Sequence, residues 1–187
     1  MSGDHSRFTS RPLRNFSGVL EQQGRVRLDA DANEAHDIAD RRLRVETVDV
    51  IGEAVVPRET IDGFKIANGA GITIGRGRAY VHGLLAECWG DTSNPAALTF
   101  DPVTGDVRGT PKLAYANQPF FYAPNFPAVP AGDGLMYLDV WTREVTATED
   151  PSLKDIALGG VDTTTRAQTA WQVKGLALAA PAVSHAD

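Results

Sequence analysis

The longest regular pattern of apolar positions begins near Asp31 and has the spacing of an α-helix. Apolar side chains recur there every three or four residues: Ala32, Ala35, Ile38, Ala39 and Leu43. Asp31 and Glu34 have the spacing of a capping box, in which both side chains accept hydrogen bonds from backbone N–H groups at the helix start. The pattern predicts one long helix over residues 31–51 that ends near Gly52.

Most other apolar positions form short runs between glycine, proline and asparagine residues, which is typical of β-strands joined by turns. Alternation of period two is clearest at Thr169, Trp171 and Val173, so one face of that strand should be buried. The other predicted strands lie within residues 64–67, 72–74, 78–87 with a break at Gly83, and 136–146.

Asp150 and Pro151 are residues that start helices, and the apolar positions after them predict a short helix over residues 151–158. The chain contains 18 glycines and 11 prolines, which favours many turns and argues against a helix bundle. The predicted fold class is therefore α+β: mainly short antiparallel β-strands with one long N-terminal helix and one short helix.

Residues 1–30 precede the long helix and lack a repeating apolar pattern. Residues 1–16 mix arginine, serine and aromatic residues without a period of 2 or 3.6. The turn-like pair Gln23-Gly24, between two short apolar segments, predicts a hairpin. We therefore expect residues 1–30 to form an extended docking arm and hairpin (the arm), which takes its shape from whatever it lies against.

The remainder predicts a β-rich body, residues 31–176, and a flexible tail or linker, residues 177–187. Within the body, residues 111–134 hold five of the eleven prolines together with several aromatic residues. Proline interrupts strand pairing, whereas aromatic rings favour burial. This segment is expected to be an ordered loop that either covers the body's own core or faces a partner.

The amino-acid composition excludes some classes of protein and disfavours others. The chain has 187 residues, of which 42% are hydrophobic and 22% charged, and this excludes a wholly disordered protein. The formal net charge of −6 disfavours nucleic-acid binding, because phosphates would be repelled. A single cysteine, Cys88, allows neither an intrachain disulfide nor a cysteine zinc site. Since no apolar run suits a signal peptide or a membrane span, we expect a protein made in the cytoplasm.

Two runs are partly similar to ligand-binding motifs. Asp29, Asp31 and Asn33 have the spacing of calcium-loop ligands, but the glycine and final glutamate of such a loop are missing, so helix capping is the better interpretation. Gly75-Arg76-Gly77-Arg78 is similar to a glycine-rich phosphate loop, but it lacks a following helix, so a hairpin turn is expected. The four histidines are far apart, and the residues predict neither a metal site nor a catalytic motif.

Two other function classes stay open. A hydrolase would need paired carboxylates, for which Asp139 and Glu144 are candidates, although an odd spacing puts them on opposite faces of a strand. A carbohydrate- or cell-surface-binding module would stack sugars on aromatic rings, for which the candidates are Trp89, Phe120, Phe121 and Tyr122.

Several longer stretches of the chain have distinctive amino-acid sequences. They are residues 1–8 (MSGDHSRF), 17–31 (SGVLEQQGRVRLDAD) with Asn33-Glu34, 72–83 (ITIGRGRAYVHG), 137–145 (YLDVWTREV), 157–162 (ALGGVD), Thr165-Arg166 and 171–173 (WQV). Together they resemble an uncharacterised bacterial family associated with phage tails and contractile injection systems. The resemblance covers most of residues 1–175.

What the resemblance implies is a noncatalytic structural component of a phage-tail-like contractile injection particle, near the baseplate or the attachment of a fibre or spike. It implies no enzyme activity, catalytic residue, metal or cofactor. The expected partners are other subunits of the particle, further copies of this chain included, since a homo-oligomer is expected. The residues expected to contact partners lie in the arm and the proline-rich loop: Arg7, Phe8, Arg11, Arg14, Phe16, Phe120, Phe121, Tyr122 and Phe126.

Overall fold

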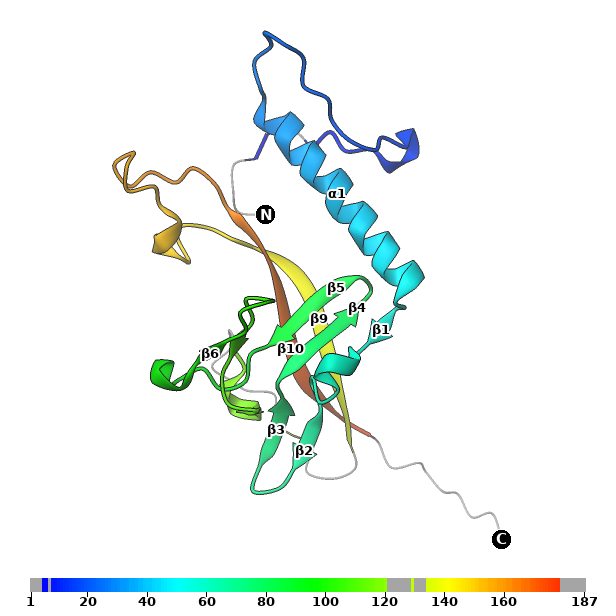
Figure 1. The fold of residues 1–187 in the computed structure, drawn as a ribbon, viewed down its shortest axis with the longest axis vertical. Coiled ribbons are helices and arrows are strands. Elements are labelled where there is room, and N and C mark those ends of the chain that lie inside the picture. The colour runs from blue at the N-terminus through cyan, green and yellow to red at the C-terminus, as the bar shows by residue number, and fades with distance from the viewer. Residues whose placement is uncertain (1–4, 7, 121–128, 130–133, 179–187) are drawn as a thin grey trace. The chain divides into compact units, whose positions relative to one another are not determined.

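The computed structural model describes residues 5–6, 8–120, 129 and 134–178 (Figure 1). One long helix precedes a series of short antiparallel strands, which confirms the predicted α+β class. The chain divides into two compact units. The helix unit comprises Met1–Val55, Tyr80–Leu84 and Thr142–Gln168, and the sheet unit comprises Val56–Ala79, Leu85–Trp141 and Thr169–Asp187.

The long helix α1 spans Asp29–Val50 and begins slightly earlier than its apolar pattern predicts. The predicted capping box is wrong: Leu28 is the N-cap residue, no side chain caps the helix, and Asp31 and Glu34 lie inside it. Asp29 and Asp31 occupy the first turn, where the helix dipole favours carboxylates. The acidic residues therefore stabilise the helix start through their charge rather than by capping.

The C-terminal end of α1 lies where the sequence places it. The N–H groups of Ile51 and Gly52 both donate to the carbonyl of Thr47, at 2.9 and 3.3 Å, and the helix does not continue beyond them. Of its 22 residues, those that are buried are Ala30, Ile38 and Thr47. Most of the helix surface is therefore left uncovered by the helix unit.

Two small antiparallel sheets lie in the sheet unit. The first has the order β2-β3-β8, formed by Ile66–Asn68, Ile72–Gly75 and Lys112–Ala114. The second pairs β6 (Thr99–Phe100) with β7 (Val107–Arg108). In the first sheet Ile74 pairs with Leu113, and both are buried, so the register directs this pair to the core face.

The remaining strands include the longest ones of the chain. β1 (Ala54–Val55) pairs with β4 (Gly77–Val81), and β4 neighbours β5 (Leu84–Cys88). β9 (Gly134–Val145) neighbours β10 (Arg166–Ala177), and both contribute residues to the two units. The predicted strands and the predicted break between β4 and β5 are thus confirmed, except at the start of the strand predicted over residues 64–67. Phe64 lies in a turn with a φ of 57°, and β2 begins at Ile66. The described residues also contain short 3-10 helices: η1 (Pro12–Arg14), η2 (Arg58–Thr60), η3 (Pro95–Ala97), η4 (Tyr115–Asn117) and η5 (Pro151–Leu153).

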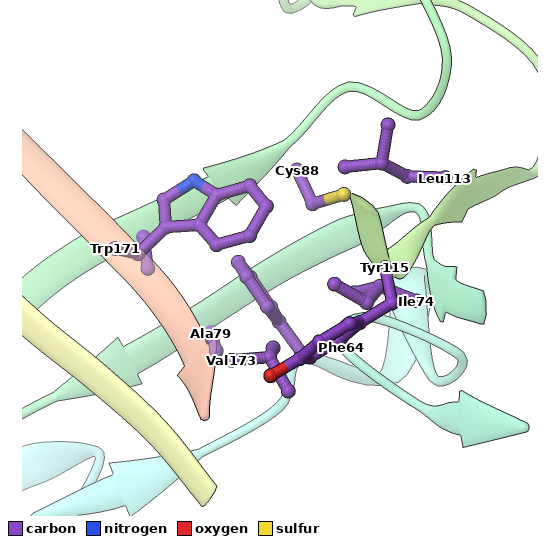
Figure 2. Packing of buried hydrophobic residues seen from close by; sticks show 9 residues of the cluster. Phe64, Ile74, Ala79, Cys88, Leu113, Tyr115, Trp171 and Val173 are labelled. Carbon is purple, nitrogen blue, oxygen red and sulfur yellow. The ribbon is translucent and has the colours of Figure 1, made fainter. Parts of the chain in front are cut away.

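The hydrophobic core belongs to the sheet unit and includes the fully buried Trp171 (Figure 2). The ring of Phe64 meets the indole edge-on, with 4.9 Å between ring centroids and 90° between planes. The indole Nε1 donates to the carbonyl oxygen of Glu87 at 2.8 Å, so burial of the ring leaves no polar atom unpaired. The other core residues are Ile74, Ala79, Ala86, Cys88, Leu113, Tyr115 and Val173.

The first part of the proline-rich segment is a strand, although an ordered loop is predicted over residues 111–134. Leu113 in β8 and Tyr115 in η4 are both buried in the core. The loop prediction is wrong here because Pro111 precedes the strand and so removes no hydrogen bond from its ladder. Residues 121–128 and 130–133 lie outside the described residues.

A buried amide, that of Gln118, fixes the described first part of this segment against β10. Gln118 Nε2 donates to the carbonyls of Tyr115 and Val173, both at 3.1 Å, and its Oε1 accepts from the Val173 N–H at 2.6 Å. Buried polar groups cost free energy unless they are hydrogen-bonded, and this side chain pairs backbone groups as a strand would. Residues 113–120 therefore cover the core of their own unit.

The predicted hairpin in the arm is wrong. A turn forms at Gln23-Gly24, and the N–H of Arg25 donates to Gln22 O at 3.2 Å, but no strand flanks the turn. The apolar segments on either side are short and largely exposed. Such segments cannot bury a face, which a hairpin needs for stability.

The predicted helix over residues 151–158 is wrong beyond its first turn, which is η5. Asp150 caps this turn by accepting from the N–H of Ser152 at 3.0 Å. The carboxylate of Asp155 then accepts from the N–H groups of Ala157 and Leu158, at 2.8 and 3.1 Å. These local hydrogen bonds compete with those of a helix, so the chain turns instead.

Candidate functional site

The arm exposes large apolar side chains. Leu13, Leu20 and Val26 are 97%, 92% and 85% exposed, and Phe8 and Phe16 are 59% and 50% exposed. Full burial of one such side chain is worth about 1.5–3 kcal/mol. The arm thus carries apolar surface that the helix unit does not cover.

Two contacts place part of the arm beside α1. The hydroxyl of Thr9 donates to the carboxylate of Glu34. Pro12 and Phe16 line a small cavity of about 10 Å³ together with Ile38 of the helix. These contacts cover one buried helix residue and leave Leu13, Leu20 and Val26 of the arm in solvent.

The arginines of the arm are also accessible. Arg11 and Arg14 are exposed, and neither has a carboxylate partner among the described residues. Arg7 lies outside the part of the chain that the structure describes. The described arm therefore combines apolar side chains with unpaired positive charge, which suits a partner surface that is apolar with acidic groups.

Phe120 of the proline-rich segment packs on the core, unlike the exposed apolar residues of the arm. The ring of Phe120 is half-buried and meets the indole of Trp171 edge-on, with 6.0 Å between centroids and 81° between planes. Its carbonyl accepts from Gln172 Nε2 at 3.3 Å. The structure thus gives Phe120 a packing role. Three other residues expected to contact partners lie outside the described residues: Phe121, Tyr122 and Phe126.

The two acids considered for a hydrolase are each engaged by another side chain. The ammonium group of Lys174 contacts the carboxylate of Asp139. His5 Nε2 contacts the carboxylate of Glu144. Each carboxylate therefore has a partner within its own unit.

The described residues offer no assembled metal centre. No group of three or more histidine, cysteine, aspartate or glutamate side chains in that part of the chain is arranged to hold a metal ion. Asp29, Asp31 and Asn33 belong to the helix α1 rather than to a loop. Cys88 is 1% exposed, and burial raises the pKa of its thiol, so the sulfur stays protonated at neutral pH and is a poor nucleophile.

A pocket of about 730 Å³ in the sheet unit is a feature that the sequence did not predict. The run Gly75-Arg76-Gly77-Arg78 forms part of its wall. The predicted hairpin turn is wrong, because this run is the corner between β3 and β4, which pair in different sheets. One feature of the sequence could have indicated this wall: Arg76 and Arg78 are two residues apart, so their side chains can share one face of an extended chain.

Trp89 also lines the pocket, so one aromatic candidate for sugar binding lies at a concave surface. The others do not join it in the described residues, since Phe120 packs on the core and Phe121 and Tyr122 are not described. The two aromatic candidates that the structure describes, Trp89 and Phe120, therefore do not line the same pocket.

Comparison with known proteins identifies one family. Residues 1–186 match the model described as "Family of unknown function (DUF6519)", and the chain belongs to that family. No curated protein and no solved structure matches the chain. Within the described residues, none of the helices combines the length and apolar character needed to cross a bilayer.

Proposed function

We propose that this chain is a noncatalytic structural component of a phage-tail-like contractile injection particle, near the baseplate or the attachment of a fibre or spike. The exposed apolar surface of the arm carries the proposal. Leu13, Leu20 and Val26 are among the most exposed large apolar residues of the chain, and all three precede α1. Docking of the arm onto a neighbouring subunit would bury them.

The energetics favour docking of the arm over independent folding. An isolated segment without a core does not recover the conformational entropy that ordering costs, about 1–2 kcal/mol per residue for the backbone. A neighbouring subunit supplies the missing apolar contacts, at about 25 cal/mol per Å² of buried apolar surface. The unpaired Arg11 and Arg14 favour acidic groups at the edge of that contact.

The test replaces arm residues in the full-length chain. The variant Leu13→Ser/Leu20→Ser/Val26→Ser removes the most exposed apolar groups of the arm. Particles would be purified from cells that make them, and the amount of this subunit would be measured by quantitative mass spectrometry. We expect the variant to be lost from the particle, as we also expect for deletion of residues 1–16.

The matched control changes equally exposed apolar residues outside the arm. Val103 and Ile156 are 90% and 91% exposed, so Val103→Ser/Ile156→Ser removes two side chains of similar exposure without touching the arm. This control should enter the particle at the normal level. Normal incorporation of the arm variant, or equal loss of both variants, would overturn the proposed role of the arm.

The expected homo-oligomer needs a separate measurement. Sedimentation velocity of the purified chain and of the arm variant compares their masses in solution. A self-association that the arm variant loses indicates that copies of this chain use the arm as their contact. If the chain stays monomeric at all concentrations, the expected homo-oligomer is contradicted, and the partner of the arm must be a different subunit.

A further inference from the structure

The pocket of the sheet unit has a local charge opposite in sign to that of the whole chain. Four carboxylates and five cationic side chains line it, so it carries a formal charge of +1, whereas the chain carries −6. The cationic residues are Lys65, Arg76, Arg78, Arg108 and Lys112. A negatively charged group therefore finds more cationic than anionic side chains along the wall of this pocket.

Three of these cations are matched by carboxylates of the pocket wall. The pairs are Lys65–Asp62 at 2.9 Å, Arg78–Asp106 at 3.3 Å, and Arg108–Asp101. Each pair balances its own charge, so none of them accounts for the positive surplus.

Arg76 and Lys112 have no carboxylate partner among the described residues. Arg76 Nη1 donates to the carbonyl of Gly109 at 2.7 Å, which holds one part of the guanidinium while its other N–H donors stay available. Lys112 is exposed, and its backbone pairs with Gly75, the residue before Arg76. Arg76 directly follows β3 and Lys112 is the first residue of β8, and both line the pocket.

Close backbone packing fixes this corner of the pocket. A Cβ atom on Gly75 would lie 2.0 Å from the carbonyl oxygen of Asp62, so only glycine allows the chain after η2 to lie directly against the end of β3. The N–H of Arg76 also donates to Pro111 O at 3.0 Å. The backbone that carries the Arg76 side chain is therefore held on two sides.

We infer that this pocket binds a carboxylate group through Arg76 and Lys112. A guanidinium presents parallel N–H donors that match the two oxygens of a carboxylate, and an ammonium group adds a second positive charge. The group is supplied either by an acidic side chain of a polypeptide or by a free small acid. This inference does not depend on the proposed role of the arm, because the pocket belongs to the sheet unit.

Charge distinguishes a carboxylate from a phosphate at this site. One carboxylate carries a single negative charge, which balances the surplus of +1 in the pocket. A phosphate monoester carries about −1.5 to −2 at neutral pH and would exceed this surplus, which leaves net negative charge beside Glu59, the lining carboxylate that none of the three pairs includes. The pocket should therefore prefer the carboxylate.

The test is a titration of the full-length chain, followed by two-dimensional NMR of its backbone amides. The probes are acetyl-Gly-Glu-Gly-amide, its Gln counterpart, sodium acetate and sodium phosphate. We expect the Glu peptide to give saturable shifts near Arg76 and Lys112 with a dissociation constant in the millimolar range, about what one or two ion pairs provide. The Gln peptide should give none, and phosphate should bind more weakly.

Two lysine variants separate the specific contact from the general field. Lys112→Gln and Lys65→Gln remove the same charge from the pocket, but only Lys112 is unpaired. Lys112→Gln should weaken binding by at least about fivefold, since a hydrogen bond to a charged group is lost. Lys65→Gln should weaken it by less than about twofold. Lys112 is exposed, so neither result depends on a variant that fails to fold.

Every outcome of the titration decides the inference. Tighter binding of the Glu peptide than of acetate identifies a polypeptide as the source of the carboxylate, and equal binding identifies a free small acid. The inference is overturned by equal binding of the Gln peptide, by tighter binding of phosphate, or by equal effects of the two lysine variants. The absence of saturable shifts up to about 50 mM overturns it too, because the expected affinity lies below that concentration.

Discussion

The sheet unit and the helix unit differ in where their apolar side chains lie. Among the described residues of the sheet unit, nine that are buried form one cluster, which includes Trp171. In the helix unit α1 buries three of its 22 residues, and Leu13 and Leu20 of the arm are almost fully exposed. The sheet unit is thus stabilised by its own core, whereas apolar surface of the helix unit remains available for a partner.

The largest expected effect comes from the centre of the sheet-unit core. Trp171→Ala removes a buried indole and leaves the carbonyl of Glu87 without its donor. We expect the free energy of unfolding to fall by about 3–5 kcal/mol. Urea unfolding followed by far-UV circular dichroism measures the change.

The control for this variant lies in the arm. Leu13→Ala shortens a side chain that is 97% exposed, so its effect should stay within about 0.5 kcal/mol. Similar losses for the two variants would remove the contrast between the units.

A smaller effect is expected at Gly90, which tests how tightly the sheet-unit backbone packs. Gly90 has φ of +79°, and a Cβ there would lie 1.8 Å from the carbonyl oxygen of Thr110. Gly90→Ala should therefore cost about 2–4 kcal/mol, from backbone strain together with steric overlap. Thermal unfolding of the two proteins measures the difference.

Gly105 provides the matched comparison for this substitution. Its φ of +73° is similar, but a Cβ there would meet nothing within 4 Å. Gly105→Ala should cost about 1–2 kcal/mol, which is the strain alone. If both alanine variants lose the same stability, close packing against Thr110 contributes nothing.

The smallest effect is expected from the arm. The Leu13→Ser/Leu20→Ser/Val26→Ser variant changes only exposed side chains, so the free energy of unfolding should stay within about 0.5 kcal/mol of the parent value. Urea unfolding of the purified chain measures it. A loss above about 2 kcal/mol would mean that the chain buries its own arm in solution, since burial of each such side chain is worth that much.

Part of the fold follows from local sequence alone. The helical spacing after Asp31 and the alternation around Trp171 predict α1 and β10, because amphipathic periodicity records which side of an element is buried. Local hydrogen bonds change the ends of elements, as Asp155 does after η5. Periodicity carries no information on such bonds, which explains why the helix predicted over residues 151–158 is too long.

The arm gives one prediction from local sequence that is confirmed and one that is wrong. Its lack of a repeating apolar pattern predicts that it has no core of its own, and Leu13 and Leu20 are exposed in the structure. The hairpin expected at Gln23-Gly24 is absent, because turn residues alone do not provide a face for burial.

The sequence by itself determined the class of fold, the long helix and the buried strand around Trp171, since these depend on spacing within one segment. Only the tertiary structure decided that the glycine–arginine corner between β3 and β4 helps to line a charged pocket together with the β6–β7 hairpin. The physical reason is that strand pairing between distant segments brings Arg76 near Gly109 and Lys112, and no local period encodes that contact.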